Sequence, residues 1–160
     1  MHDELWNHAL ALYARPGVES ACLALQALGA DVCLLLCATW LEARRVPASA
    51  LRASELRAIA EPWQRDVVEP LRMLRRQWRS LAQGDVQLAA LREQVKALEL
   101  DAERTLLWRL QAHAQQWPAS PDGPTGDWLE WLAPEQAGGH DALRQLRAAA
   151  QGRQDAVDGD

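Results

Sequence analysis

The chain has 160 residues, of which 49% are hydrophobic and 24% are charged, with a net charge of −5. This length and apolar content suit one globular domain with a buried core and exclude a largely disordered chain. The 29 alanines and 26 leucines favour helices over sheet. The longest apolar run, Val32 to Leu41, is too short to cross a membrane and predicts a buried helix.

The N-terminal residues Met1 to Trp6 lack the basic region and the apolar stretch of a signal peptide. The three cysteines, Cys22, Cys33 and Cys37, lie among apolar residues and lack the close spacing of metal ligands. We interpret them as reduced core thiols of a cytoplasmic protein that has no membrane association. No motif for a cofactor or a metal is found.

Three helices are predicted first, over residues 3–14, 16–28 and 31–44. Arg15-Pro16-Gly17 ends the first helix, Gly29 caps the second and Asp31 caps the third. The third is apolar nearly all round, which predicts that it is the central helix.

A short helix over 55–60, capped by Ser54, comes next, and Pro62 opens a longer helix with a kink at Pro70. An apolar stripe follows this longer helix at Trp63, Val67, Leu71, Leu74, Trp78 and Leu81. After a break at Gly84, a helix over 86–116 carries the stripe Leu88, Leu91, Val95, Leu98 and Ala102. Two striped helices joined by a short loop predict an antiparallel hairpin with Gly84 at its tip.

Residues 118–140 are predicted to form an irregular connection with a short tryptophan-containing helix, followed by a helix over 141–150 and a disordered acidic tail over 152–160. The fold class is therefore all-α, a single helical bundle over residues 1–151. A three-helix N-terminal layer packs on a long antiparallel helical hairpin. The chain lacks recognisable catalytic motifs, and the acidic pair Glu99 and Glu103 is interpreted as a solvated face, so an enzyme is not expected.

Charge is uneven along the chain: residues 44–79 carry nine arginines and four acidic residues, between acidic ends. The candidate partner-binding arginines lie in this block: Arg65, Arg72, Arg75, Arg76 and Arg79. Such a block indicates either a site for an anionic partner or internal pairing of charges. An acidic protein surface is the preferred partner because the whole chain is acidic, with nucleic acid as the alternative.

Two tryptophans, Trp128 and Trp131, lie in the segment flanked by proline and glycine. They either fasten this segment to the hairpin or form an exposed docking motif. The sequence thus favours a non-catalytic interaction or adaptor protein that uses the arginines and this pair, with homodimerisation as a further possibility. Nucleic-acid binding through the same arginines is the alternative, and a third hypothesis is a small-ligand pocket or enzyme site between the N-terminal layer and the hairpin.

Three segments together resemble a known family. They are Ala9 to Gln26, Gly29 to Leu36 with Trp40-Leu41, and Pro62-Trp63 with Val67-Val68-Glu69-Pro70-Leu71-Arg72 and Arg75-Arg76. Over about residues 5–80 the chain resembles an uncharacterised family of small bacterial cytoplasmic proteins, classed as a domain of unknown function. The resemblance implies a helical cytoplasmic protein and makes residues 67–72 the first place to look for a site.

Overall fold

The computed structural model describes residues 3–122 and 127–157, and within these ranges no residue belongs to a β-strand. The all-α prediction is confirmed. The N-terminal helices are α1 (Glu4–Tyr13), α2 (Val18–Ala27) and α3 (Val32–Ala43). None of the described helices combines the length and apolar character that a membrane span needs.

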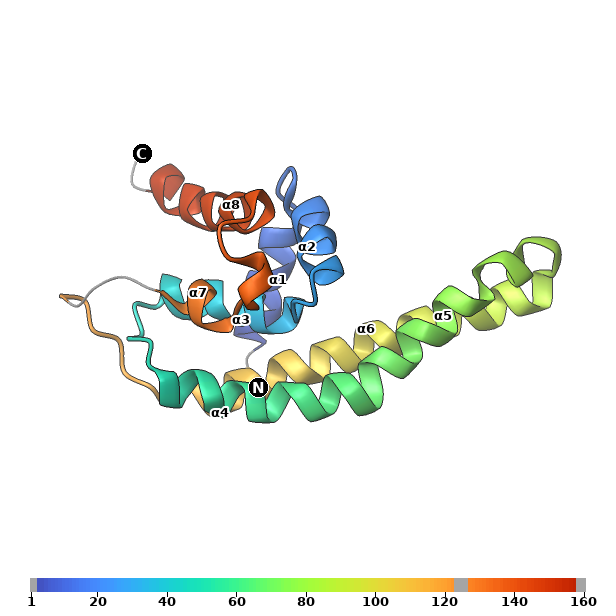
Figure 1. Ribbon diagram of the computed structural model, residues 1–160, viewed down its shortest axis with the longest axis horizontal. Helices are drawn as coiled ribbons and strands as arrows, with labels where there is room; N and C mark the ends of the chain where they lie inside the picture. The colour runs from blue at the N-terminus through green and yellow to red at the C-terminus, as the bar shows by residue number, and fades with distance from the viewer. Residues whose placement is uncertain (1–2, 123–126, 158–160) are drawn as a thin grey trace.

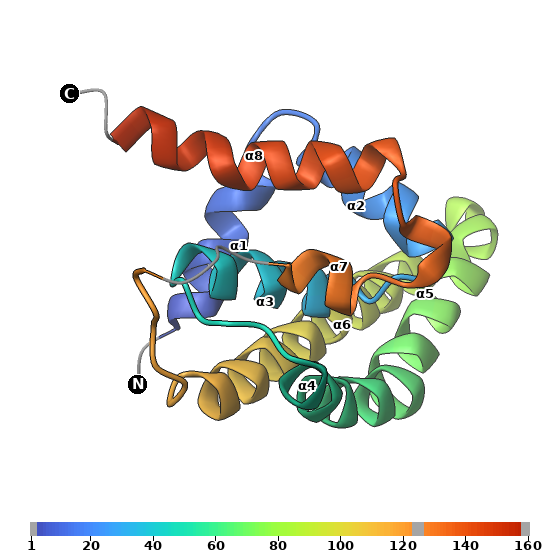
Figure 2. The same cartoon turned by 60° about the vertical axis from the view of Figure 1, so that its left-hand side comes forward.

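Helix α3 is the centre of the core, as its sequence predicts. It contacts α1, α2, α4, α6, α7 and α8, and every residue from Cys33 to Leu41 is buried. In Figure 2 it lies between α8 above and the long hairpin below. Its N-terminus is capped by Asp31, whose Oδ1 accepts a hydrogen bond from the Leu34 N–H at 3.2 Å.

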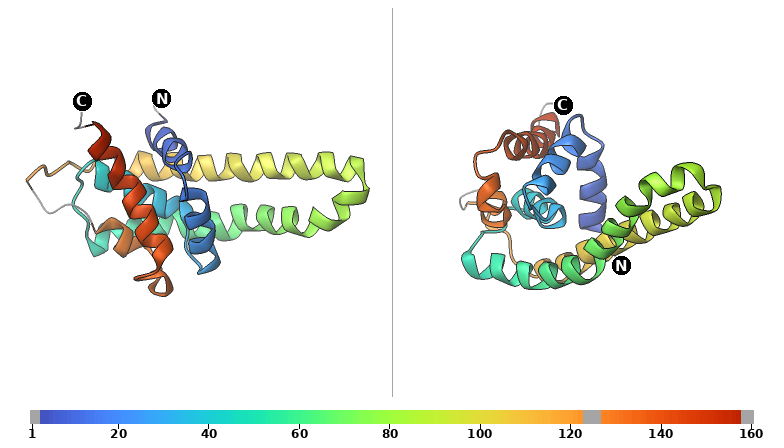
Figure 3. Two further views of the ribbon diagram at one scale, coloured as in Figure 1. Left: turned by 90° about the horizontal axis from the view of Figure 1, so that it is seen from above. Right: turned by 45° about the vertical axis from the view of Figure 1, so that its right-hand side comes forward.

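A long antiparallel hairpin lies beneath this core (Figure 1). Its first arm consists of α4 (Ala50–Trp63), the π-helical segment η1 (Gln64–Val68) and α5 (Glu69–Leu81). The 3₁₀ turn η2 (Ala82–Gly84) leads into α6 (Val86–Ala114). The outer half of the pair projects beyond the other helices, with η2 at its tip (Figure 3). Gly84 therefore lies in the turn, as predicted.

The first arm departs from the prediction in two places. Ser49, not Ser54, caps α4, because its Oγ accepts from the Arg52 N–H at 3.2 Å, and the helix runs through Pro62 to Trp63. The kink expected at Pro70 takes the form of the π-helical segment, which ends two residues before it. Proline clashes with the carbonyl four residues earlier, and a π turn widens the helix at that level. The wider turn also rotates the faces of α5 relative to those of α4.

The C-terminal part closes the other side of α3. It contains α7 (Trp128–Leu132), the 3₁₀ turn η3 (Glu135–Ala137) and α8 (Asp141–Val157). Helix α7 packs on α3 and α4, and α8 packs on α2 and α3. The predicted tail is helical over residues 152–157, because Gly152 costs a helix only about 1 kcal/mol and helix-forming residues follow it. The rest of that tail, 158–160, lies outside the described residues.

Candidate functional site

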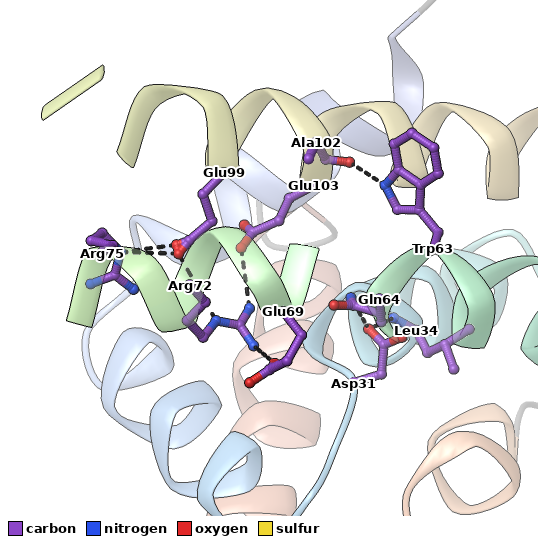
Figure 4. Close-up of polar contacts among 10 residues, drawn as sticks. All are labelled: Asp31, Leu34, Trp63, Gln64, Glu69, Arg72, Arg75, Glu99, Ala102 and Glu103. Atoms are coloured by element: carbon purple, nitrogen blue, oxygen red, sulfur yellow. Dashed lines mark hydrogen bonds and ion pairs between the residues drawn. The ribbon is translucent and has the colours of Figure 1, made fainter. Parts of the chain in front are cut away.

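Two arginines of α5 turn onto α6 and bind its carboxylates (Figure 4). The Nε of Arg75 donates to both oxygens of Glu99, each at 3.0 Å. Arg72 donates from Nη2 to Glu103 at 3.3 Å and from Nη1 to Glu69 at 3.1 Å. Glu99 is only 5% exposed. The interpretation of Glu99 and Glu103 as a solvated face is therefore wrong.

The direction of helical side chains accounts for these pairs. Side chains of a helix lean toward its N-terminus, and the N-terminus of α5 points from the tip toward the body of the molecule. The long side chains of Arg72 and Arg75 consequently reach back to the level where α6 meets the body. Both residues were predicted to face a partner, but only 12% and 24% of their side chains are exposed. They belong to an internal ion-pair cluster of Glu69, Arg72, Arg75, Glu99 and Glu103.

A cavity of about 290 Å³ opens beside this cluster, between the N-terminal helices and the hairpin. Its apolar wall contains Trp6, Leu10, Leu23, Leu36, Leu100 and Leu107. Its polar wall contains Tyr13, Gln26, Asp31, Gln64, Arg72, Arg75, Glu99 and Glu103. The sequence raised a pocket at this interface only as its third hypothesis. We call it the interhelical cavity.

Gln26 and Gln64 connect the polar wall to the N-terminal helices. With its side-chain oxygen turned toward Arg72, Gln26 accepts from Nη1 at 2.8 Å and from Nη2 at 2.9 Å. Gln64 donates to Asp31 Oδ1 at 2.9 Å. Gln64 lies in the π-helical segment, so that segment helps to direct a polar side chain toward the cavity.

Burial shifts the pKa values of several groups around the cavity. It raises the pKa of Glu103, although Arg72 opposes the shift. It also raises the pKa of Asp31, against the hydrogen bonds from Leu34 and Gln64. The pKa of the Cys22 thiol rises to about 11 through burial, so this cysteine is protonated near neutral pH and is not an activated nucleophile.

A second hollow, of about 860 Å³, lies along the outside of the first arm. Its basic wall contains Arg57 of α4, Arg65 of η1 and Arg76 of α5, with Arg72 behind them. Its apolar side contains Leu23, Ala27, Leu34, Leu132 and Pro134. We call it the arginine groove. Two of the predicted arginines, Arg65 and Arg76, are exposed at this groove, and Arg57 joins them there.

The remaining predicted arginines differ in their surroundings. Arg65 is exposed and forms an ion pair with its neighbour Asp66 at 2.9 Å. Arg76 is exposed at the groove, and no ion pair of Arg76 is found among the described residues. Arg79 is exposed farther along α5 and does not line the groove. The five predicted arginines are thus divided into buried, groove and outer residues.

The two candidate tryptophans have different environments. Trp128 is fully buried, donates from Nε1 to the Val46 carbonyl at 2.7 Å and stacks on Trp117 with ring centroids 5.7 Å apart. The hypothesis that Trp128 is an exposed docking residue is therefore wrong, because it fastens the C-terminal segment to the core. Trp131 is 41% exposed, and its backbone carbonyl accepts a hydrogen bond from Arg57 of the arginine groove.

The cysteines and histidines do not form a metal site in the part of the chain that the structure describes. No group of three or more His, Cys, Asp or Glu side chains there is arranged to hold a metal ion. Cys22, Cys33 and Cys37 are free and buried. His8 lies beside Thr39, with Nε2 and Oγ1 2.8 Å apart.

Comparison with known proteins gives one match. Residues 4–110 match the model of a family described as "Protein of unknown function (DUF2390)". This span covers α1 to α6 except the last turn of α6, and so includes every residue that lines the interhelical cavity. Neither the curated proteins nor the solved structures contain a match.

Proposed function

For a chain that belongs to the DUF2390 family, we propose that it is a non-catalytic interaction or adaptor protein that binds an acidic segment of a partner protein along the arginine groove. The observation that carries this proposal is the row of Arg57, Arg65 and Arg76 beside an apolar strip in one hollow of about 860 Å³. Arginine is enriched at protein interfaces and their cores are apolar, so arginines beside apolar side chains favour a protein segment as the ligand.

Charge complementarity supports an acidic partner. Among the described residues, neither Arg57 nor Arg76 forms an ion pair, and Arg57 instead binds the Trp131 carbonyl. Guanidinium groups bind carboxylates through two parallel hydrogen bonds, which favours Asp or Glu in the partner. Asp31, Glu61 and Glu69 also line the groove. Of these, Glu69 is already bound to Arg72, and Asp31 accepts from Gln64 and from the Leu34 N–H.

The apolar strip supports a protein segment over nucleic acid. Leu23 is 56% exposed, and it lines the groove together with the exposed Ala27 and the half-buried Pro134. Leu34 and Leu132 are buried in the core beneath them. A partner that places leucine or aromatic side chains on this strip gains apolar burial that a phosphate backbone does not offer.

The experiment compares the wild type and two charge-reversed proteins as baits in extract of the native cells, with and without nuclease treatment. One variant carries Arg57→Glu, Arg65→Glu and Arg76→Glu, and a control variant carries Arg79→Glu and Lys96→Glu outside the groove. Captured proteins are identified by mass spectrometry, and their binding is then measured with purified components. We expect a partner with an acidic segment that binds the wild type and the control but not the groove variant.

Two outcomes contradict the proposal. If every association disappears on nuclease treatment, the same arginines serve the alternative function of nucleic-acid binding. If the groove variant retains every association, the arginines have no part in binding. Capture of the chain itself, lost in the groove variant, identifies a homodimer as the complex formed.

We also propose that this protein acts in the bacterial cytoplasm. The free cysteines support a reducing compartment. The residues that resemble a bacterial family support a bacterial origin. Fractionation of the native cells, followed by immunodetection, tests the compartment.

A further inference from the structure

The interhelical cavity is separate in chemistry from the arginine groove. Its volume of about 290 Å³ lies near the lower end of the 300–1,000 Å³ that is usual for small-molecule pockets. Most of its wall is apolar, and the charged groups gather on the side of α5 and α6. A small apolar molecule with one polar end matches this division.

The wall of the cavity carries more acidic than basic side chains. Three carboxyl groups line it, those of Asp31, Glu99 and Glu103, against the two guanidinium groups of Arg72 and Arg75. Both terminal nitrogens of Arg72 are occupied, because they bind Glu69, Glu103 and Gln26, and its Nε lies 4.0 Å from Glu99. An added positive charge is therefore favoured in the cavity over an added negative one.

One acceptor remains open at this wall. Glu103 accepts from Arg72 through Oε1, whereas no hydrogen bond to its Oε2 is found among the described residues. Burial raises the pKa of Glu103, and burial, together with the nearby Cys22 and Glu103, raises the pKa of Tyr13.

The cavity is less suited to an anionic ligand than to a cationic one. The terminal nitrogens of Arg75 have no hydrogen bond among the described residues, but Arg75 also lines the outer surface of α6 beside Glu93 and Lys96. An anion bound there would lie at the solvent-exposed edge, next to the carboxylates of Glu93 and Glu99.

We propose that the interhelical cavity binds a small apolar amine, with its ammonium group on Glu103 and its apolar body against Trp6, Leu10 and Leu107. The binding energy comes from apolar burial, and the charge-assisted hydrogen bond fixes the orientation. The cavity and the arginine groove share part of their walls, including Leu23 and Arg72. The residues that the tests change line only one of the two, so either proposal can fail without the other.

Three matched probes test the charge preference by isothermal titration calorimetry. Tryptamine, tryptophol and indole-3-propionate share the indole ring and differ in an ammonium, a hydroxyl and a carboxylate group. We expect tryptamine to bind most tightly. The affinity for indole-3-propionate should be lower by a factor of about ten or more, which corresponds to one charge-assisted hydrogen bond. Tighter binding of indole-3-propionate, or no binding of any probe at millimolar concentration, overturns the proposal.

Two pairs of variants locate the site. Glu103→Gln is expected to lower the affinity for tryptamine about tenfold. Glu93→Gln removes the same charge from an exposed position on α6 and should leave the affinity unchanged. Leu10→Trp fills the cavity from its half-exposed edge and abolishes binding, while Leu51→Trp on the exposed side of α4 does not. Equal affinity in Glu103→Gln and Glu93→Gln overturns the assignment to Glu103. If Glu103→Gln does not fold, the Leu10→Trp pair decides.

Discussion

Arg75 holds both oxygens of Glu99 through a single nitrogen, with each Nε–O distance 3.0 Å, at the level where the hairpin leaves the body. Glu99 is among the few charged or polar side chains that the described core buries. The pair therefore links α5 to α6 at the point where the hairpin begins to project from the body. The free energy of unfolding that is lost on mutation depends on whether one partner of the pair or both are removed.

We predict that Arg75→Met destabilises the protein by roughly 3 kcal/mol, because it leaves the buried Glu99 carboxylate without its main partner. The double variant Arg75→Met with Glu99→Leu should recover most of this loss, since an apolar pair needs no desolvation of charge. Urea denaturation followed by circular dichroism measures both. A double variant less stable than the single one contradicts the prediction.

Trp128→Ala should cost about 3–5 kcal/mol of the free energy of unfolding, through the lost ring volume and the unpaired Val46 carbonyl. Trp128→Phe should cost less, because most of the stacking on Trp117 remains. Trp131→Ala is the matched control on the same helix and should change stability by less than about 1 kcal/mol. Thermal and urea denaturation test the three variants. Equal losses of stability at the two positions would argue against the role of Trp128 in fastening the C-terminal segment to the core.

Asp31 should make stability fall as the pH rises. Its pKa is raised by burial, so its protonated form contributes stability that is fully present below the unfolded value of 3.8 and is lost as the pH rises through the folded pKa. Asp31→Asn keeps a capping oxygen for α3 and removes this dependence. The variant should therefore gain stability relative to the wild type as the pH rises above the unfolded value of 3.8.

The control for this change is Asp85→Asn, which makes the same substitution at an exposed cap, where Asp85 accepts from the Leu88 N–H at 3.1 Å. Free energies of unfolding at several pH values compare the two variants. A loss of stability in Asp31→Asn that is the same at every pH would show that the cap geometry, and not the charge, dominates at this position.

Deletion of Asp66 should convert the π-helical segment to regular α-helix. Because a π turn accommodates one extra residue within a helix, the deletion leaves the register of α5 relative to α4 unchanged, and Arg72 and Arg75 still face α6. We therefore expect helical content by circular dichroism and the urea midpoint both to be kept. A large fall in the urea midpoint would mean that the wide turn itself, and not only the register of α5, contributes to stability.

Helical periodicity predicted the elements well where a single pattern decides them. Helix α3 is apolar all round and is central, and Asp31 and Gly84 mark a cap and a turn that the structure contains. Periodicity failed at α6, where Leu91 and Leu98 were placed in the stripe but are 50% and 54% exposed. The seam is shifted because Glu99 turns inward to meet arginines from α5.

The candidate site was harder to predict for the same reason. A stripe of leucines defines a face of one helix, but an ion pair between two helices depends on their relative register. That register is set by the π-helical segment and by the turn. Pro70 and Gly84 indicated where these two features lie, but not how they rotate α5 relative to α6. The pairing of arginines at 72 and 75 with glutamates at 99 and 103 was nevertheless a usable signal, because each pair of like charges lies on one helix face. Residues 67–72, which carry the resemblance, do contain two members of the cluster, Glu69 and Arg72.

The packing of the C-terminal helices on α3 determines how much of the chain is needed for folding. The family model ends at residue 110, whereas Trp128, Leu129 and Leu146 are fully buried in the same core as α3. A fragment ending at residue 110 would leave one side of α3 uncovered, with leucines exposed to water. In this protein, the segment shared with the family is therefore shorter than the cooperative unit that folds.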